Sequence, residues 1–124
     1  LKKVSKKKIV RSNKKEYYKN KHHALRFIKE RLEFFNSFYK FHYQKVSIRN
    51  QNTIWGSCTR SGNLQFNYKL AQVSSRMRDY VIVHELCHLR EHNHSHRFWN
   101  LVAGMIPDYK AIRKEMRKLV MRTD

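Results

Sequence analysis

The longest regular pattern of apolar residues lies between positions 14 and 38. Apolar side chains recur there every three or four residues, and Lys and Glu fill many of the positions between them. This spacing places the apolar side chains on one face of a helix, so residues 14–38 are predicted to form an amphipathic helix that packs on a core. The predicted stripe consists of Leu25, Ile28, Leu32 and Phe35, extended by one step at each end by Tyr18 and Phe38.

The period of the pattern then falls to two. Residues 45–49 and 64–68 alternate between apolar and polar side chains, and residues 53–55 form a short run with strand composition. Alternation is typical of strands with one buried face, and the Ser-Gly-Asn sequence at 61–63 is a turn signal. We therefore predict three short, mostly antiparallel strands within residues 45–69, with the last two joined by a hairpin.

Residues 76–90 are predicted to form a second helix, which the Ser-Ser pair at 74–75 can cap. Residues 80–89 are apolar nearly all round, which is typical of a helix buried in a core. His84, Glu85 and His88 interrupt this apolar surface. Burying such polar groups is costly unless a partner stabilises them, and a metal ion would be such a partner.

The remaining residues predict two C-terminal helices. Apolar residues keep helical spacing from Phe98 to Val102, and Gly104 and Pro107 end this helix. A last helix begins near position 108. With 124 residues the chain is the size of one domain, so the pattern predicts an α+β fold with an N-terminal helix, a small sheet, a central helix and two C-terminal helices. The apolar face of the last helix is predicted to consist of Ile112, Met116, Leu119 and Val120.

The segment from His84 to His88 has the pattern H-E-x-x-H. Two histidines four residues apart lie on the same face of a helix, one turn apart, and can bind one zinc ion. Glu85 lies beside the first histidine and can take a proton from a metal-activated water. The sequence therefore predicts a site with one Zn²⁺ per chain, with His84 and His88 as ligands and Glu85 as general base.

A third ligand must come from a later residue. His92 shares the helical face, but it would lie about 12 Å from His84 along a continuous helix. Ligand nitrogens on one zinc lie within roughly 4 Å of each other, so the helix must end and the chain must turn back. Asn93 tolerates the left-handed conformation that ends helices. His94 is the preferred third ligand, and the alternatives left open are His96, Glu115 and Asp108.

Charge and cysteine content limit the cellular context. The net charge is +19, and nearly half of the 28 Lys and Arg lie in residues 1–31. We expect residues 1–13 to be a basic arm, either partly disordered or containing a short edge strand, before a domain formed by residues 14–124. The charge of residues 1–31 would allow weak, non-specific binding of nucleic acid. With two cysteines, no long apolar run and no visible secretory signal, we expect a cytoplasmic protein with reduced thiols and no membrane contact.

The chain contains a set of short motifs: Trp55-Gly56-Ser57-Cys58, Asn67, Leu70, Asp79-Tyr80-Val81, His84-Glu85-Leu86-Cys87-His88, Asn93-His94-Ser95 and Phe98-Trp99. Together they resemble the YgjP-like metallopeptidase family, and the likeness covers about residues 45–121. This resemblance implies a zincin-like α+β domain in which His84, His88 and His94 bind the metal and Glu85 is the general base. The chain is also distantly similar to SprT-like proteases, which act on DNA-bound proteins, and some family members are labelled UTP pyrophosphatases.

The main hypothesis is a zinc metallopeptidase that acts on a peptide or protein substrate. Residues 64–68 are expected to form an edge strand with which an extended peptide pairs, with Asn67, Tyr68 and Tyr109 as candidate substrate contacts. One alternative is a metal-dependent nucleotide hydrolase. The other is a basic nucleic-acid-binding module with a structural zinc, which a fourth protein ligand would favour.

Overall fold

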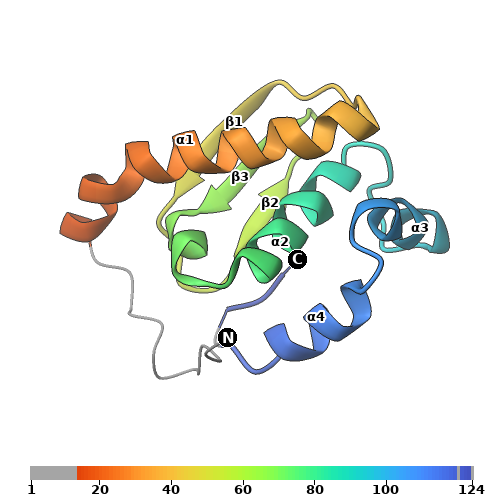
Figure 1. Ribbon diagram of the computed structural model, residues 1–124. Helices are drawn as coiled ribbons and strands as arrows, with labels where there is room; N and C mark the ends of the chain where they lie inside the picture. Colours follow the sequence, from red (N-terminus) through yellow and green to blue (C-terminus); the bar gives the residue numbers. More distant parts are fainter. Residues whose placement is uncertain (1–13, 120, 124) are drawn as a thin grey trace.

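The computed structural model describes residues 14–119 and 121–123, and the predicted arm at residues 1–13 lies outside this part of the chain. The fold is α+β, as predicted, with a small sheet and helices in the predicted order (Figure 1). The elements are α1 (Lys14–Tyr39), β1 (Lys45–Arg49), β2 (Gly56–Cys58), β3 (Asn63–Asn67), the 3-10 helix η1 (Tyr68–Gln72), α2 (Ser75–Cys87), α3 (His96–Met105) and α4 (Tyr109–Met116).

Helix α1 forms where the apolar period predicts it. Its buried face is made by Ala24, Ile28, Leu32 and Phe35. The extension of this stripe was wrong, because Tyr18 is 61% exposed and Phe38 is 58% exposed. The helix ends at Lys40, which has a positive φ of 58°, and the Lys40 amide donates to the Asn36 carbonyl. This is a left-handed helix end made by a residue other than glycine.

The sheet has the order β1-β3-β2 and is mixed. Strand β3 pairs antiparallel with β2 through the predicted hairpin, whose turn contains Gly62 at a φ of 91°. The pairing of β1 with β3 is parallel, so the prediction of a mostly antiparallel sheet was wrong for one of its two pairs. The hairpin turns β3 back between the other two strands, and β3 rather than β2 therefore lies beside β1.

The second strand begins later than the predicted residues 53–55. Trp55 is fully buried, and its amide donates to the Arg122 carbonyl at 2.9 Å, while the Arg122 amide donates to the Thr53 carbonyl at 2.8 Å. The C-terminal residues therefore provide the hydrogen-bond partners for the backbone of residues 53–55. The hydrogen-bonded pairing of β2 with β3 begins only at Gly56.

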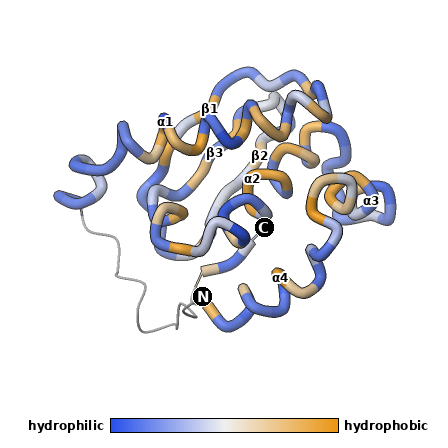
Figure 2. The backbone as a smooth tube through the Cα atoms, viewed as in Figure 1, coloured by the Kyte–Doolittle hydropathy of each residue, from blue (hydrophilic) through white to orange (hydrophobic). Residues whose placement is uncertain are grey.

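Helix α2 is the centre of the fold and packs against α1, α3, α4, β2 and β3. Every residue from Tyr80 to His88 is buried, and Figure 2 shows apolar segments where the helices and strands meet. Burying each large aliphatic side chain contributes about 1.5–3 kcal/mol, so the segment that carries the H-E-x-x-H pattern is also a main source of stability. Among the described residues, no helix is long and apolar enough to cross a membrane.

Candidate metal centre

Two of the three predicted ligands lie at the buried end of α2, His84 in its last turn and His88 at its C-cap. His84 is 1% exposed and His88 is 5% exposed. The Ser74 side chain caps the start of this helix by accepting from the Met77 amide, as predicted. The helix therefore has a fixed start, and its packing in the core fixes the direction of both imidazoles.

The chain turns back after α2 as the distance argument requires. The last regular helical residue is Cys87, and the Arg90 and Glu91 amides then donate to the Cys87 carbonyl at 3.1 and 3.0 Å. The expectation of a left-handed Asn93 was wrong, because Lys40 is the one non-glycine residue with a positive φ in the described part of the chain. The reversal is instead made by this hydrogen-bonded turn.

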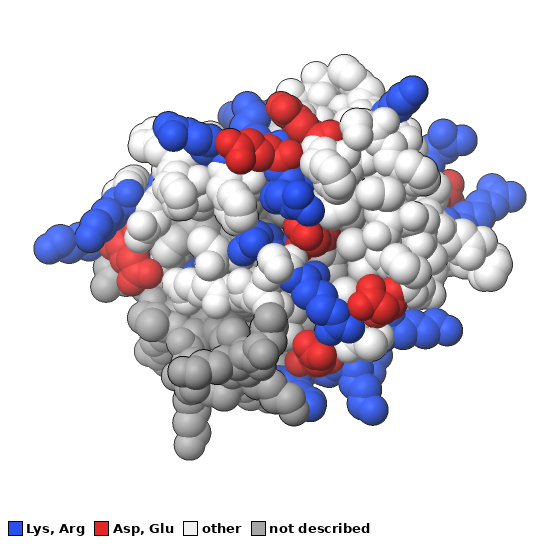
Figure 3. Space-filling view, in the orientation of Figure 1, with Lys and Arg blue, Asp and Glu red and all other residues white. Residues whose placement is uncertain are grey.

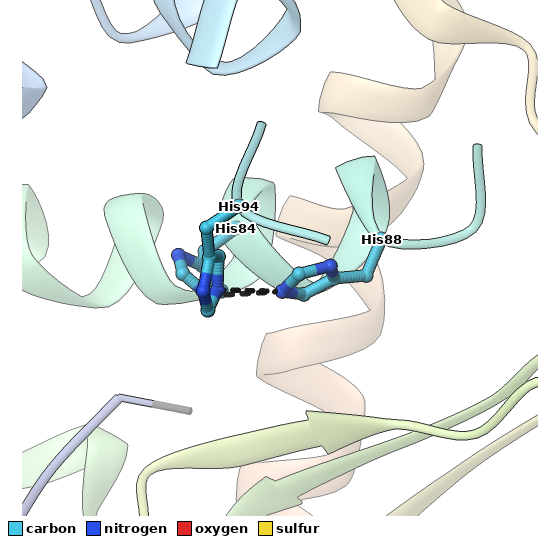
Figure 4. A group of neighbouring side chains, drawn as sticks. All are labelled: His84, His88 and His94. Carbon is cyan, nitrogen blue, oxygen red and sulfur yellow. Dashed lines mark hydrogen bonds between the residues drawn. The ribbon is translucent and has the colours of Figure 1, made fainter. Parts of the chain in front are cut away.

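The reversal brings the third histidine to the first two (Figure 4). The Nε2 atoms of His84 and His88 are 3.2 Å apart, those of His88 and His94 are 3.0 Å apart, and those of His94 and His84 are 3.2 Å apart. Three imidazoles bound to one zinc at about 2.0–2.1 Å hold their nitrogens roughly 3.3 Å apart. The observed triangle is close to this spacing.

The hydrogen bond at the far side of the His88 ring fixes which of its nitrogens carries a proton. His88 Nδ1 lies 2.9 Å from the Glu91 carbonyl oxygen, which can only accept, so Nδ1 carries the proton and Nε2 of the neutral ring presents a lone pair. His84 Nδ1 lies 3.1 Å from the Tyr80 hydroxyl. Nitrogen lone pairs that converge on one point repel each other unless a cation lies between them, so the donor set fits a metal ion.

His94 differs from the other two ligands because it is exposed. Its ring stacks on Trp99 with a centroid distance of 5.7 Å and an interplanar angle of 24°, and it meets Phe98 edge-on at 5.1 Å. Trp99 in turn stacks on Tyr109 at 5.0 Å and 8°. Aromatic contacts from α3 and α4 therefore orient a ligand that the core does not enclose.

Glu85 is fully buried beside the histidines, and β2 lies directly against it. A Cβ atom placed on Gly56 would lie 3.1 Å from Glu85 Cγ and 3.1 Å from the Gln65 carbonyl oxygen. Any larger residue at this position would push on the backbone of β3 and on the carboxylate side chain. Glycine at this position therefore lets an edge strand approach the candidate base.

The alternative ligands lie elsewhere. The one group of three or more histidine, cysteine or acidic residues with metal-ligand spacing, among the described residues, is His84, His88 and His94. His92 and His96 are exposed and are not in it. Asp108 and Glu115 both bind Arg76, at 2.9 and 3.0 Å. His94 is thus the third member of the group, as preferred from the sequence.

The proposed substrate contacts do not gather at this centre. Asn67 is 1% exposed, donates to the Gln51 and Ile54 carbonyls, and accepts from the Lys69 amide, so it anchors a loop. Tyr68 is 3% exposed and meets Tyr17 of α1 edge-on. Tyr109 reaches the centre indirectly, through its stacking on Trp99. Strand β3 is central in the sheet, so the expected substrate-pairing edge at residues 64–68 was wrong.

Sequence reasoning missed three residues that shape the centre, namely Tyr80, Trp99 and Gly56. A signal for Tyr80 was present, because it precedes His84 by one helical turn and so lies on the same face. Trp99 and Gly56 stood in recognised motifs. The contacts of Trp99 with His94 and of Gly56 with Glu85 depend on the packing of different elements, so no periodicity could show them.

Comparison with known families and structures agrees with this geometry. Residues 1–119 match the family described as YgjP-like, metallopeptidase domain. The match begins at residue 1, whereas the motifs in the sequence had placed the resemblance only at about residues 45–121, so that range was too narrow. No curated protein gave a significant match.

Among solved structures, the chain is similar to the metallopeptidase zymogen abylysin of Pyrococcus abyssi. The TM-score is 0.69 at 22% identity, and the likeness covers 78% of this chain and 99% of that chain. At this identity the likeness shows a shared fold.

Proposed function

The chain belongs to the YgjP-like family of metallopeptidase domains, and on that premise we propose that it hydrolyses peptide bonds with a zinc ion held by His84, His88 and His94. The observation that carries the proposal is the triangle of Nε2 atoms with sides of 3.0–3.2 Å. The proton on His88 Nδ1 and the Tyr80 hydroxyl beside His84 Nδ1 support binding through Nε2. When bound, zinc supplies a Lewis acid and lowers the pKa of a bound water to about 7.

Glu85 moves the proton in this proposal. Its position next to His84 in the chain, on the buried part of α2, places a carboxylate beside the ligand set. A carboxylate there can accept the proton of the attacking water and deliver it to the leaving amine. Glu85 is itself fully buried, so the core shields its carboxylate from bulk water.

Strand β2 is the element best placed to hold the substrate. It is an edge strand of the sheet, and Gly56 brings its backbone against Glu85. An extended peptide that pairs with this edge would pass the candidate base and the three histidines. This assignment replaces the expectation that β3 forms the edge.

The two alternatives have less support. A structural zinc needs a fourth protein ligand, and the group formed by the described residues has three. Nucleotide hydrolysis would use the same metal and base, so it must be tested directly with UTP.

The test is a Glu85→Gln variant of the full chain, compared with Glu30→Gln on the exposed side of α1. We expect both to bind about one zinc per chain by elemental analysis, because the ligands are intact. Glu85→Gln should lower the turnover of unfolded protein substrates by about 10²–10⁴-fold, since an amide cannot accept the proton. Near-normal turnover by Glu85→Gln would exclude Glu85 as the general base. Cleavage of UTP without cleavage of peptides would show that the substrate is a nucleotide rather than a peptide.

A further inference from the structure

A groove lined with arginines opens beside the metal centre. A small hollow of about 180 Å³ is lined by His88, by Cys58 at the end of β2, and by Arg60, His92 and Asn93. A second, open hollow of about 570 Å³ shares the last three of these residues. The two hollows therefore form one groove that runs outward from a metal ligand past the end of the edge strand.

Three arginines from three separate elements line this groove. Arg60 lies in the turn between β2 and β3, Arg90 follows α2, and Arg97 lies in the first turn of α3. One acidic residue, Glu91, accompanies them among the described lining residues. The ion pairs between described residues engage Arg31 and Arg76, and they engage none of these three.

Local helix stability does not account for this arrangement. A cation after the end of α2 is favoured by the helix dipole, which explains Arg90 alone. Arg97 stands at the start of α3, where the dipole disfavours positive charge, and no acidic residue occupies that first turn. Lys and Arg are spread over the face seen in Figure 3, with acidic groups among them. The groove is therefore distinguished by the convergence of three arginines from separate elements rather than by its charge alone.

We propose that this groove binds acidic side chains of the substrate, so that the enzyme selects peptides with Asp or Glu on the side of the cleaved bond that lies in the groove. This proposal rests on the proposed peptidase function. An extended peptide on the edge of β2 continues into the turn that carries Arg60, and its side chains then meet Arg90 and Arg97. Guanidinium groups bind carboxylates through paired hydrogen bonds, which suits charges spaced along a peptide.

A compact phosphate group fits the groove less well. The three guanidinium groups come from a turn, a post-helical segment and a helix start, and the sequence has no glycine-rich loop whose amides would surround a phosphate. Binding of nucleic acid by the same residues is therefore an outcome that the experiment must separate from peptide binding.

The experiment uses the full chain loaded with Zn²⁺ and a pair of labelled twelve-residue peptides. One peptide carries three Glu, and its twin carries Gln at the same positions. Binding is measured by fluorescence anisotropy on the Glu85→Gln variant, and kcat/KM is measured on the natural sequence. We expect the acidic peptide to bind about three- to tenfold more tightly than its twin, the size expected for one or two partly exposed charged pairs.

The Arg60→Gln/Arg97→Gln double variant should bring this ratio close to one, and Arg26→Gln on the exposed side of α1 should leave it unchanged. The ratio should also shrink at high salt, because exposed charges are screened. Equal binding of the two peptides, or an undiminished ratio in the double variant, would overturn the groove proposal and leave the peptidase standing.

A labelled single-stranded DNA serves as a competitor in the same titration. If DNA displaces the bound peptides and the protein binds the acidic peptide and its twin equally, the ligand of the groove is a nucleic acid rather than an acidic peptide. Selective binding of the acidic peptide without hydrolysis of either peptide by the zinc-loaded natural sequence would support the groove and refute the proposed function. The two failures are therefore distinguishable.

Discussion

The end of α2 and the loop that follows it contribute to the same centre in opposite ways. His84 and His88 are ligands enclosed by the core, and their orientation follows from the packing of a buried helix. His94 is exposed and is oriented by stacking on Trp99 and by an edge contact with Phe98. A substitution of His84 or His88 should therefore lower both the affinity for the metal and the stability of the fold, whereas a substitution of His94 should lower the affinity alone.

The largest expected effect separates these two regions. His84→Ala and His94→Ala should both lose zinc, since each removes one of three ligands. In the metal-free protein, His84→Ala should lower the free energy of unfolding by about 2 kcal/mol or more, because it leaves a cavity in the core. His94→Ala should change it by about 0.5 kcal/mol or less, as expected for an exposed residue. Elemental analysis and urea unfolding with a chelator measure both quantities.

His92→Ala is the matched control for this pair, because His92 lies in the same loop and is outside the histidine group. It should retain both zinc and stability. If His92→Ala lost zinc while His94→Ala kept it, the assignment of the loop ligand would be incorrect.

A smaller effect should follow from removing the support of the exposed ligand. Trp99→Ala leaves all three histidines in place but removes the ring on which His94 stacks. Loss of such an orienting contact is expected to weaken zinc binding about tenfold or more, as measured by competition with a chromophoric chelator. Trp99→Phe keeps an aromatic ring and should recover most of the affinity. Equal zinc affinity in Trp99→Ala and the natural sequence would show that the loop orients His94 without this contact.

The smallest effect contrasts the chemistry of the two thiols. Cys87 lies in the core on α2, and burial raises the pKa of its thiol to about 12. Because this thiol stays protonated until the pH approaches that value, it should not react with a disulfide reagent at pH 8 in the native protein. Cys58 lines the groove, is half-buried, and should react first. The measurement is the time course of thiol release for Cys58→Ser and Cys87→Ser, and a native protein in which Cys87 reacts as fast as Cys58 would contradict the prediction.

The helices and the metal ligands could be predicted because their signals are local. The spacing of apolar residues located α1, and a fixed rise per residue excluded His92 and required a reversal before His94. The turn itself was predicted at the right place with the wrong backbone conformation at Asn93. Periodicity also failed at the ends of α1, where Tyr18 and Phe38 keep the spacing but are more than half exposed.

The sheet and the surroundings of the centre could not be predicted, because they depend on contacts between distant segments. Pairing of β1 with β3 rather than β2 follows from the packing of the whole sheet, which no alternation pattern encodes. Asn67 matched a recognised motif, yet its amide anchors the loop before β2. Its role as a substrate contact therefore has no support from its position in the fold.

The closeness of the three ligands along the chain has a consequence for folding. His94 follows His84 by ten positions, and His88 lies between them, so one short segment contains the complete donor set. An unfolded chain can therefore retain some affinity for zinc, and binding to the unfolded state subtracts from the stabilisation that a metal gives to the native state. Zinc should then raise the melting temperature less than its affinity for the native protein predicts, and the ion can associate with the segment before the sheet has assembled.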